Sequence, residues 1–385
     1  MAIMGRRGAI NQMLSAGAFG LTASLWGNGA HQSEGEEISE VERAAMGSVA
    51  TDFMKEFGVP GLSVAISHKG RFAYQEGFGD AYRELGERVS VASLFRIASV
   101  SKPITSVAIF TLIEKGQLLL EDRVFGKKGI LGTQFGKQPY GKYIEDITID
   151  HLLTHTAGGW EKGENDPMFT DPARDQAHLI SWTLDNRPLN NVPGEHYGYS
   201  NFGYCLLGRV IEKITKHSYR DYVQSGILSR CAISDMKISG NTFRQRAKEE
   251  VTYYGQSGEN PYGMNVSRMD SHGGWIASAS DLVKFATRVD GFTGTESILK
   301  PETIAKMTSA SAVNGHYARG WQVNTLGNWW HNGSLPGSST ILVRTSKNFC
   351  WAALTNTRTV PSGGIDDALD KMVWNMARKV TAWKL

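Results

Sequence analysis

Runs rich in apolar residues stand near both ends of the chain, and apolar residues recur at helical spacing between them. Near the N-terminus, two such runs flank the turn His68-Lys69-Gly70 and predict a hairpin with strands at 62–67 and 71–77. Near the C-terminus, three more runs predict strands at 325–331, 339–345 and 349–356. Helices are expected before the first strands and after the last, at 38–57 and 365–384.

The middle of the chain, from residue 101 to about 265, has the pattern of helices joined by long loops that contain glycine and proline. Strands at both ends with helices between them predict an α+β protein, in which an antiparallel sheet built from the two termini is flanked by helices. On this prediction residues 31–100 and 270–385 form a sheet domain, and residues 101–269 form an inserted, mainly helical domain. A cleft is expected where the two meet.

The composition excludes several classes of function. A chain of 385 residues with 41% hydrophobic residues can bury a substantial core, and its formal charge of +3 is small. Without a basic block, nucleic acid is not expected as a partner, and no apolar run reaches the length of a membrane span. No metal-binding motif or phosphate loop is present, so neither metal nor cofactor is expected. The cysteines are too few and too separated for a disulfide framework: Cys205, Cys231 and Cys350.

The first 33 residues contain no acidic residue, and Arg6-Arg7 precede a modestly apolar stretch from Met13 to Trp26. This pattern predicts an export signal over residues 1–30, cleaved after Ala30, and a periplasmic or secreted protein. An organellar targeting peptide and a cytoplasmic tail are the alternatives.

The pattern Ser-x-x-Lys occurs three times, beginning at Ser99, Ser234 and Ser297, and roughly one or two chance matches are expected at this composition. Only Ser99 has a Tyr-x-Asn sequence downstream, Tyr199-Ser200-Asn201, which occurs once in the chain. Ser99 also opens the helical run 104–114. Context therefore favours Ser99 as the functional residue.

Ser99 and Lys102 are three positions apart at a helix N-terminus, so their side chains share one face. Serine becomes a good nucleophile only when a neighbouring base takes its proton. An uncharged lysine can be that base, and burial and the positive end of a helix both lower its pKa. The alternative, a helix-capping serine beside a solvated lysine, describes Ser234 and Ser297 better.

The segment Phe95-Arg96-Ile97-Ala98-Ser99-Val100-Ser101-Lys102 resembles the nucleophile motif of the serine β-lactamase-related family. That family includes class C β-lactamases, D-alanyl-D-alanine carboxypeptidases, D-aminopeptidases and family VIII carboxylesterases. The resemblance runs from about Val59 to about Thr355 and includes Leu152-Leu153-Thr154-His155-Thr156-Ala157-Gly158-Gly159 and His331-Asn332-Gly333. It implies a β-lactamase/transpeptidase-like fold and is specific to the superfamily rather than to one substrate.

The resemblance also implies roles for individual residues. Ser99 would attack a carbonyl carbon and become acylated, and Lys102 would help to deprotonate it. Tyr199 would shuttle the proton as a phenol coupled to Lys102 in its titration. Asn201 would hold a substrate amide or orient Lys102.

Ser334 directly follows the motif His331-Asn332-Gly333. Its backbone N–H would bind the oxyanion together with that of Ser99. His331 would contribute to substrate binding, and it stands where many relatives carry the lysine of a Lys-Thr-Gly motif. Histidine is mostly neutral above its reference pKa of about 6.5, which weakens the case for an efficient β-lactamase with carboxylate-bearing substrates. Asn201, in contrast, favours amides over esters.

The sequence therefore predicts a serine hydrolase that acts through an acyl-enzyme on a small ester, amide or D-amino-acid peptide. Carboxylesterase and D-amino-acid peptidase activity both stay open. A penicillin-binding sensor or a structural protein of the same fold with little turnover is the alternative. His155 is expected to bond a loop backbone rather than act as a base. The loop from Thr156 to Asp175 includes Glu161, Glu164, Asp166 and Asp171, to which no role is assigned.

Overall fold

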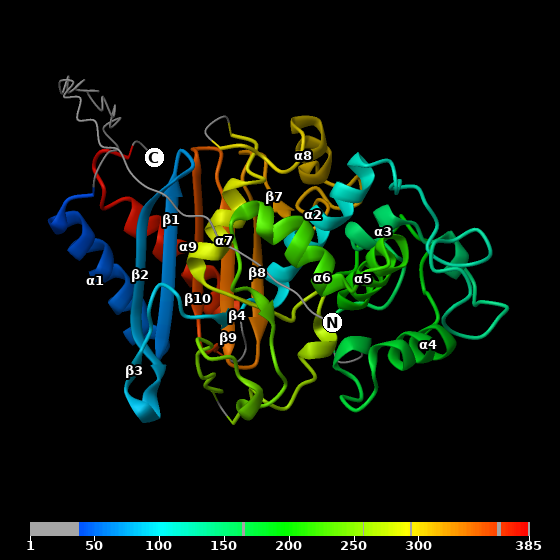
Figure 1. The fold of residues 1–385 in the computed structure, drawn as a ribbon, viewed down its shortest axis with the longest axis horizontal. Helices are drawn as coiled ribbons and strands as arrows, with labels where there is room; N and C mark the ends of the chain where they lie inside the picture. Colours follow the sequence, from blue (N-terminus) through cyan, green and yellow to red (C-terminus); the bar gives the residue numbers. More distant parts are fainter. Residues whose placement is uncertain (1–37, 164–165, 257, 293–294, 360–362, 384–385) are drawn as a thin grey trace, which may run out of the picture. The chain divides into compact units, whose positions relative to one another are not determined.

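A seven-stranded antiparallel sheet, with strand order β3-β2-β1-β10-β9-β8-β7, joins the two ends of the chain (Figure 1). The structure is a computed structural model that describes residues 38–163, 166–256, 258–292, 295–359 and 363–383. Within them the large sheet contains β1 (Gly61–His68), β2 (Arg71–Tyr82), β3 (Glu87–Arg88), β7 (Gln322–Val323), β8 (Trp329–Leu335), β9 (Ser338–Arg344) and β10 (Phe349–Thr355). A smaller sheet has the order β4-β6-β5, with β4 (Phe95–Arg96), β5 (Lys237–Ile238) and β6 (Trp275–Ala277).

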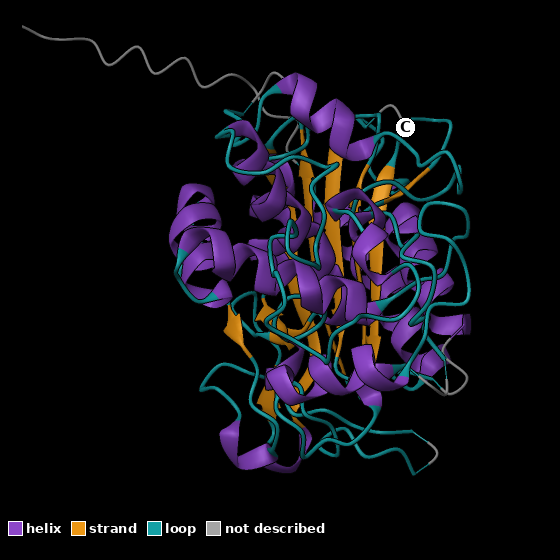
Figure 2. Cartoon of the chain, turned by 90° about the vertical axis from the view of Figure 1, so that its right-hand side faces the viewer, coloured by secondary structure: helices purple, strands orange, loops and turns teal. Residues whose placement is uncertain are grey.

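Helices cover both faces of the large sheet. Those in the described residues are α1 (Glu40–Phe57), α2 (Ser101–Glu114), α3 (Ile149–Leu153), α4 (Gln176–Asn186), α5 (Asn201–Thr215), α6 (Tyr219–Val223), α7 (Ala279–Thr287), α8 (Pro301–Thr308) and α9 (Gly363–Ala377). Helices α1 and α9 pack against each other, and α9 lies on β9 and β10. Helix α7 packs on β1, β9 and β10. Seen from the side of the inserted helices, the strands lie behind them (Figure 2).

The alternation along β1 explains how this interior strand is buried on both faces. Leu62, Val64 and Ile66 belong to the same apolar cluster as residues of α1 and α9. Ala65 points to the opposite face and joins the larger cluster that contains α7 and the inserted helices. Successive side chains of a strand point to opposite faces, so large residues serve one layer and small residues let the other layer approach.

The expected α+β fold, with an antiparallel sheet built from both termini, is confirmed. One predicted strand is displaced: β8 spans Trp329–Leu335 rather than 325–331. The displacement arises because Asn324 accepts hydrogen bonds from the backbone N–H groups of Leu326 and Asn328 and forms a turn there. The last helix, predicted to 384, ends at Ala377.

The predicted signal at residues 1–30 lies outside the described residues, as does Lys384. The described residues from Ile38 onward cluster as one compact unit, and the division at residues 100 and 270 stays a prediction. Across the described part of the chain, none of the helices has the length and apolar character needed to cross a membrane.

Candidate active site

Ser99 lies in a short 3-10 turn, Ala98–Val100, that leads directly into α2. Ala98 has a left-handed backbone with φ 48, a conformation that L-residues with a side chain rarely adopt. Such a residue costs on the order of 1–3 kcal/mol and persists only where the surroundings enforce it. Here the enforcement comes from β9, because Thr340 donates to the carbonyl oxygen of Ile97 at 2.9 Å. The backbone is thus held in a strained form directly before the serine.

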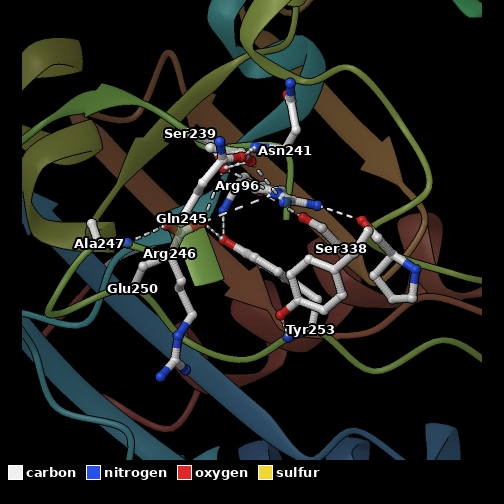
Figure 3. Close-up of polar contacts among 12 residues, drawn as sticks. Arg96, Ser239, Asn241, Gln245, Arg246, Ala247, Glu250, Tyr253 and Ser338 are labelled. Atoms are coloured by element: carbon white, nitrogen blue, oxygen red, sulfur yellow. Dashed lines mark hydrogen bonds and ion pairs between the residues drawn. The ribbon is translucent and has the colours of Figure 1, made fainter. Parts of the chain in front are cut away.

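A buried arginine anchors the segment before this turn (Figure 3). Arg96 is 1% exposed, and its Nε donates to Ser239 Oγ at 3.1 Å and lies 3.9 Å from Glu250 Oε1. Tyr253 donates to Glu250 at 2.8 Å, so the carboxylate is also hydrogen-bonded. From β9, Ser338 donates to the carbonyl oxygen of Arg96 at 2.5 Å. The paired, hydrogen-bonded guanidinium thus anchors the segment before the serine, and the Ser338 hydrogen bond joins that segment to the large sheet.

Lys102 is fully buried on the first turn of α2, one helical turn from Ser99. Its Nζ lies 3.0 Å from Ser99 Oγ, and it donates to Asn201 Oδ1 at 2.7 Å and to the carbonyl oxygen of His272 at 3.0 Å. Burial, together with the nearby charge of Lys162, lowers the pKa of Lys102 well below its ordinary value. The lysine is therefore suited to hold and release a proton beside Ser99.

Tyr199 comes immediately before α5, whose N-cap Ser200 accepts a hydrogen bond from the Gly203 N–H at 3.1 Å. The phenol lines the same cavity as Ser99, and Lys102 Nζ lies 4.8 Å from the ring centroid. Burial raises the pKa of Tyr199 above its ordinary value, so the hydroxyl carries its proton at neutral pH. Ser99, Lys102 and Tyr199 thus lie close together at the N-terminal ends of two separate helices.

Strand β8 forms the opposite wall, and Gly333 brings it against the serine turn. A Cβ at Gly333 would overlap the carbonyl oxygen of Ile97 and the Thr340 hydroxyl. Ser334, the next residue, lines the same cavity as Ser99 and accepts a hydrogen bond from Arg358 at 3.3 Å. Because Gly333 has no side chain, the backbone of β8 can lie against the serine turn, whereas Ser334 faces the cavity.

His331 also lines the cavity, but both of its ring nitrogens bond protein groups. Its Nδ1 lies 2.6 Å from the Asn332 carbonyl oxygen and must carry the proton there, which leaves Nε2 to accept from the Tyr317 hydroxyl at 3.1 Å. His155 lies on the far side of Tyr317: its Nδ1 accepts from the Ser200 N–H at 3.1 Å, and its Nε2 donates to the Tyr317 oxygen at 3.0 Å. Each group in this chain therefore donates to the next, from the N-cap of α5 through His155 and Tyr317 to His331 on β8.

Burial lowers the pKa of His331 to about 3 and the pKa of His155 well below its usual range, so both are uncharged at neutral pH. His155 bonds the loop backbone, as the sequence predicts. His331 offers no cation to a substrate, and Lys162 is the lysine that lines the cavity.

The cavity has a volume of about 280 Å³. Its lining includes five of the seven residues singled out from the sequence: Ser99, Tyr199, Asn201, His331 and Ser334. Lys102 lies behind Ser99, and Gly333 lies against the serine turn, as their contacts show. In the described part of the chain, no group of three or more histidine, cysteine or acidic residues could hold a metal ion, and the three cysteines are free and buried.

Sequence reasoning missed two residues that shape this site, Tyr317 and Asp166. Tyr317 is 2% exposed and stands in no motif, so nothing in the sequence distinguishes it from other tyrosines. Asp166 is 1% exposed, and its Oδ2 accepts from Asn201 Nδ2 at 2.7 Å. It belongs to the acid-rich loop noted above, but neighbouring Asp171 is exposed, and the sequence pattern does not separate the two.

The fold and the position of the cleft define a β-lactamase/transpeptidase-type protein. The model of the beta-lactamase family matches residues 46–371, and the chain belongs to that family.

Among curated relatives, Protein flp of Staphylococcus aureus (strain MW2) is 26% identical over an alignment of 340 residues, which covers 84% of this chain and 65% of that protein. The chain therefore spans a little under two thirds of that relative's length.

Two solved structures share the fold. D-amino acid amidase from Ochrobactrum anthropi SV3, complexed with L-phenylalanine amide, superposes with a TM-score of 0.71 at 19% identity, covering 88% of this chain and 99% of that one. EstCE1, a hydrolase with promiscuous acyltransferase activity, superposes with a TM-score of 0.68 at 20% identity, covering 85% of this chain and 98% of that one.

Proposed function

We propose that the protein is a serine hydrolase that acts through an acyl-enzyme on a small ester or amide. The observation that carries the proposal is the 3.0 Å approach of Lys102 Nζ to Ser99 Oγ in a site where the lysine is fully buried. An uncharged amine at hydrogen-bond distance is a competent general base for a serine hydroxyl.

The reaction follows from the positions of the side chains. Lys102 takes the Ser99 proton as Oγ attacks the substrate carbonyl carbon. The backbone N–H groups of Ser99 and Ser334, two residues that line the same cavity, would bind the resulting oxyanion. Tyr199, which is protonated at neutral pH and lines the same cavity, donates a proton to the leaving group and recovers one from Lys102. Water then attacks the acyl-enzyme and releases the acid.

The cavity's size and charge restrict the substrate. A volume of about 280 Å³ admits a small acyl group. The neutral His331 supplies no cation at the β8 position for a substrate carboxylate, which disfavours β-lactams as efficient substrates, although Lys162 lines the cavity elsewhere. Short esters, amides and D-amino-acid derivatives fit better, and the amidase and EstCE1 share the fold that would carry either activity.

The proposal is tested by intact-mass spectrometry after exposure to a fluorophosphonate probe, and separately to benzylpenicillin, with Ser99→Ala as the control. A probe adduct on the wild type alone supports the nucleophile. A lasting penicillin adduct favours the peptidase activity, and hydrolysis of nitrophenyl esters without an adduct favours the esterase activity. Tyr199→Phe should slow turnover about a hundredfold or more. Equal labelling of wild type and Ser99→Ala would overturn the proposal.

A further inference from the structure

Lys102 Nζ has three oxygen neighbours, and two of them can only accept hydrogen bonds. They are Asn201 Oδ1 at 2.7 Å and the carbonyl oxygen of His272 at 3.0 Å. An uncharged amine has two N–H groups and one lone pair. When both hydrogens go to these acceptors, the lone pair faces the third neighbour, Ser99 Oγ, which lies 3.0 Å away. The arrangement depends on Asn201 presenting its oxygen, rather than its nitrogen, to the lysine.

The orientation of the Asn201 amide is set by a second buried group. Its Nδ2 donates to Asp166 Oδ2 at 2.7 Å, and Asp166 Oδ1 accepts from the Met168 N–H at 2.9 Å. A carboxylate only accepts hydrogen bonds, so the nitrogen of the amide must face it. Turning the amide over would place oxygen against oxygen at Asp166 and N–H groups against the Lys102 amine. Inside the protein such unpaired contacts are expensive.

We propose that Asp166 is a positioning residue, which holds the Asn201 amide so that Lys102 turns its lone pair toward Ser99. This inference rests on the proposed serine-hydrolase function. Asp166 touches no reacting atom and acts through Asn201. Asp166 lies shortly before α4, so this part of the chain helps to position the general base Lys102.

A purely structural role for Asp166 is the competing reading. Its side chain caps the 3-10 turn Pro167–Phe169 through the Met168 N–H. Asparagine caps such turns as well as aspartate does. The variant Asp166→Asn therefore keeps the cap and the side-chain size. It changes the hydrogen bond to Asn201 and also removes a negative charge that raises the pKa of Lys102.

In Asp166→Asn, the Met168 N–H continues to donate to the side-chain oxygen, now that of an amide, and the new NH₂ group faces Asn201. The Asn201 amide must then turn over. Its own NH₂ group donates to the lone pair of Lys102, which is then no longer available to Ser99. We expect kcat for p-nitrophenyl acetate and the rate of fluorophosphonate labelling to fall about a hundredfold, with KM little changed. The thermal midpoint should stay close to that of the wild type.

Asp171→Asn is the matched control. It makes the same change in the same loop, at an exposed side chain whose partner is Arg174 at 3.0 Å. It should leave labelling and turnover unchanged.

The double variant Asp166→Asn/Asn201→Asp restores an acceptor opposite Lys102. The new carboxylate accepts from the lysine and from the new amide, so part of the lost rate should return. Because that carboxylate also stabilises the charged lysine, the recovered rate should appear at higher pH than in the wild type. A merely structural role predicts neither the loss in the single variant nor this recovery.

The outcomes separate this inference from the function beneath it. Activity or labelling that survives Ser99→Ala overturns the proposed function and this inference with it. Activity that is lost in Ser99→Ala but kept in Asp166→Asn overturns only the role of Asp166. Loss in Asp166→Asn with no recovery in the double variant at any pH also overturns it.

Discussion

Gly333 lies so close to Ile97 that a Cβ on the glycine would overlap the carbonyl oxygen of Ile97. The two residues are far apart in the sequence, one on β8 and the other directly before the serine turn. Thr340 donates to that same carbonyl oxygen at 2.9 Å, so two strands hold the turn in place. The distance between the two walls of the cavity is thus set by the absence of one side chain.

Gly333→Ala should force β8 away from the turn. Overpacking of this kind costs about 1–3 kcal/mol, and moving Ser334 relative to Ser99 should reduce ester hydrolysis further than the loss of stability alone. Urea unfolding and kcat measure the two effects. Gly315→Ala is the control, because a Cβ there meets nothing within 4 Å. Equal stability and activity of the two variants would contradict the prediction.

Lys102→Met should abolish hydrolysis and change how stability depends on pH. Burial lowers the pKa of Lys102 well below its ordinary value of 10.5, so the unfolded chain binds a proton there that the folded chain lacks. Wild-type stability relative to the variant should therefore rise with pH up to that ordinary value, by at most about 1.4 kcal/mol per pH unit. Denaturant unfolding at several pH values measures the difference. A difference independent of pH would show that the buried lysine is charged.

His331 should remain neutral, with its proton on Nδ1, between about pH 5 and pH 8. Burial lowers its pKa to about 3. At a pH below the ordinary pKa of 6.5, His331 binds a proton in the unfolded chain but not in the folded chain. This residue therefore lowers the free energy of unfolding as the pH falls from 6.5 toward about 3. Nitrogen-15 NMR of the imidazole reports the tautomer.

The same spectrum tests the hydrogen bond to Tyr317. In Tyr317→Phe the Nε2 signal of His331 should shift, because its donor is gone. The unpaired nitrogens of His331 and His155 should then lower the free energy of unfolding by about 1–3 kcal/mol each. An unchanged Nε2 signal would contradict the proton assignment.

Glu250→Gln should destabilise the protein, since it leaves the buried charge of Arg96 without its partner. Breaking a buried pair from one side costs about 3–5 kcal/mol. Arg88→Met, which breaks the exposed pair with Asp80 at 2.6 Å, should cost no more than about 1 kcal/mol. Urea unfolding of both variants makes the comparison, and similar losses in the two would refute the anchoring role of Arg96.

Much of the fold follows from local pattern. The hairpin at 62–67 and 71–77 was predictable because its strands flank a tight turn, and β1 and β2 contain both ranges. The strand predicted at 325–331 is displaced because the Asn324 side chain folds the stretch before Trp329 into a turn. A side chain that competes for backbone hydrogen bonds is weakly visible in a hydropathy pattern.

By itself, the sequence determined the candidate nucleophile and its neighbours. Ser99 and Lys102 are three positions apart at the start of one helix, a spacing that places their side chains on the same face. The order of the motifs indicated which copy of Ser-x-x-Lys to choose. Only the tertiary structure decided that Asp166, rather than Asp171, faces Asn201, and that Tyr317 joins His155 to His331. These relationships depend on which side chains are buried. Burial of an individual side chain results from contacts between segments that are distant in the sequence.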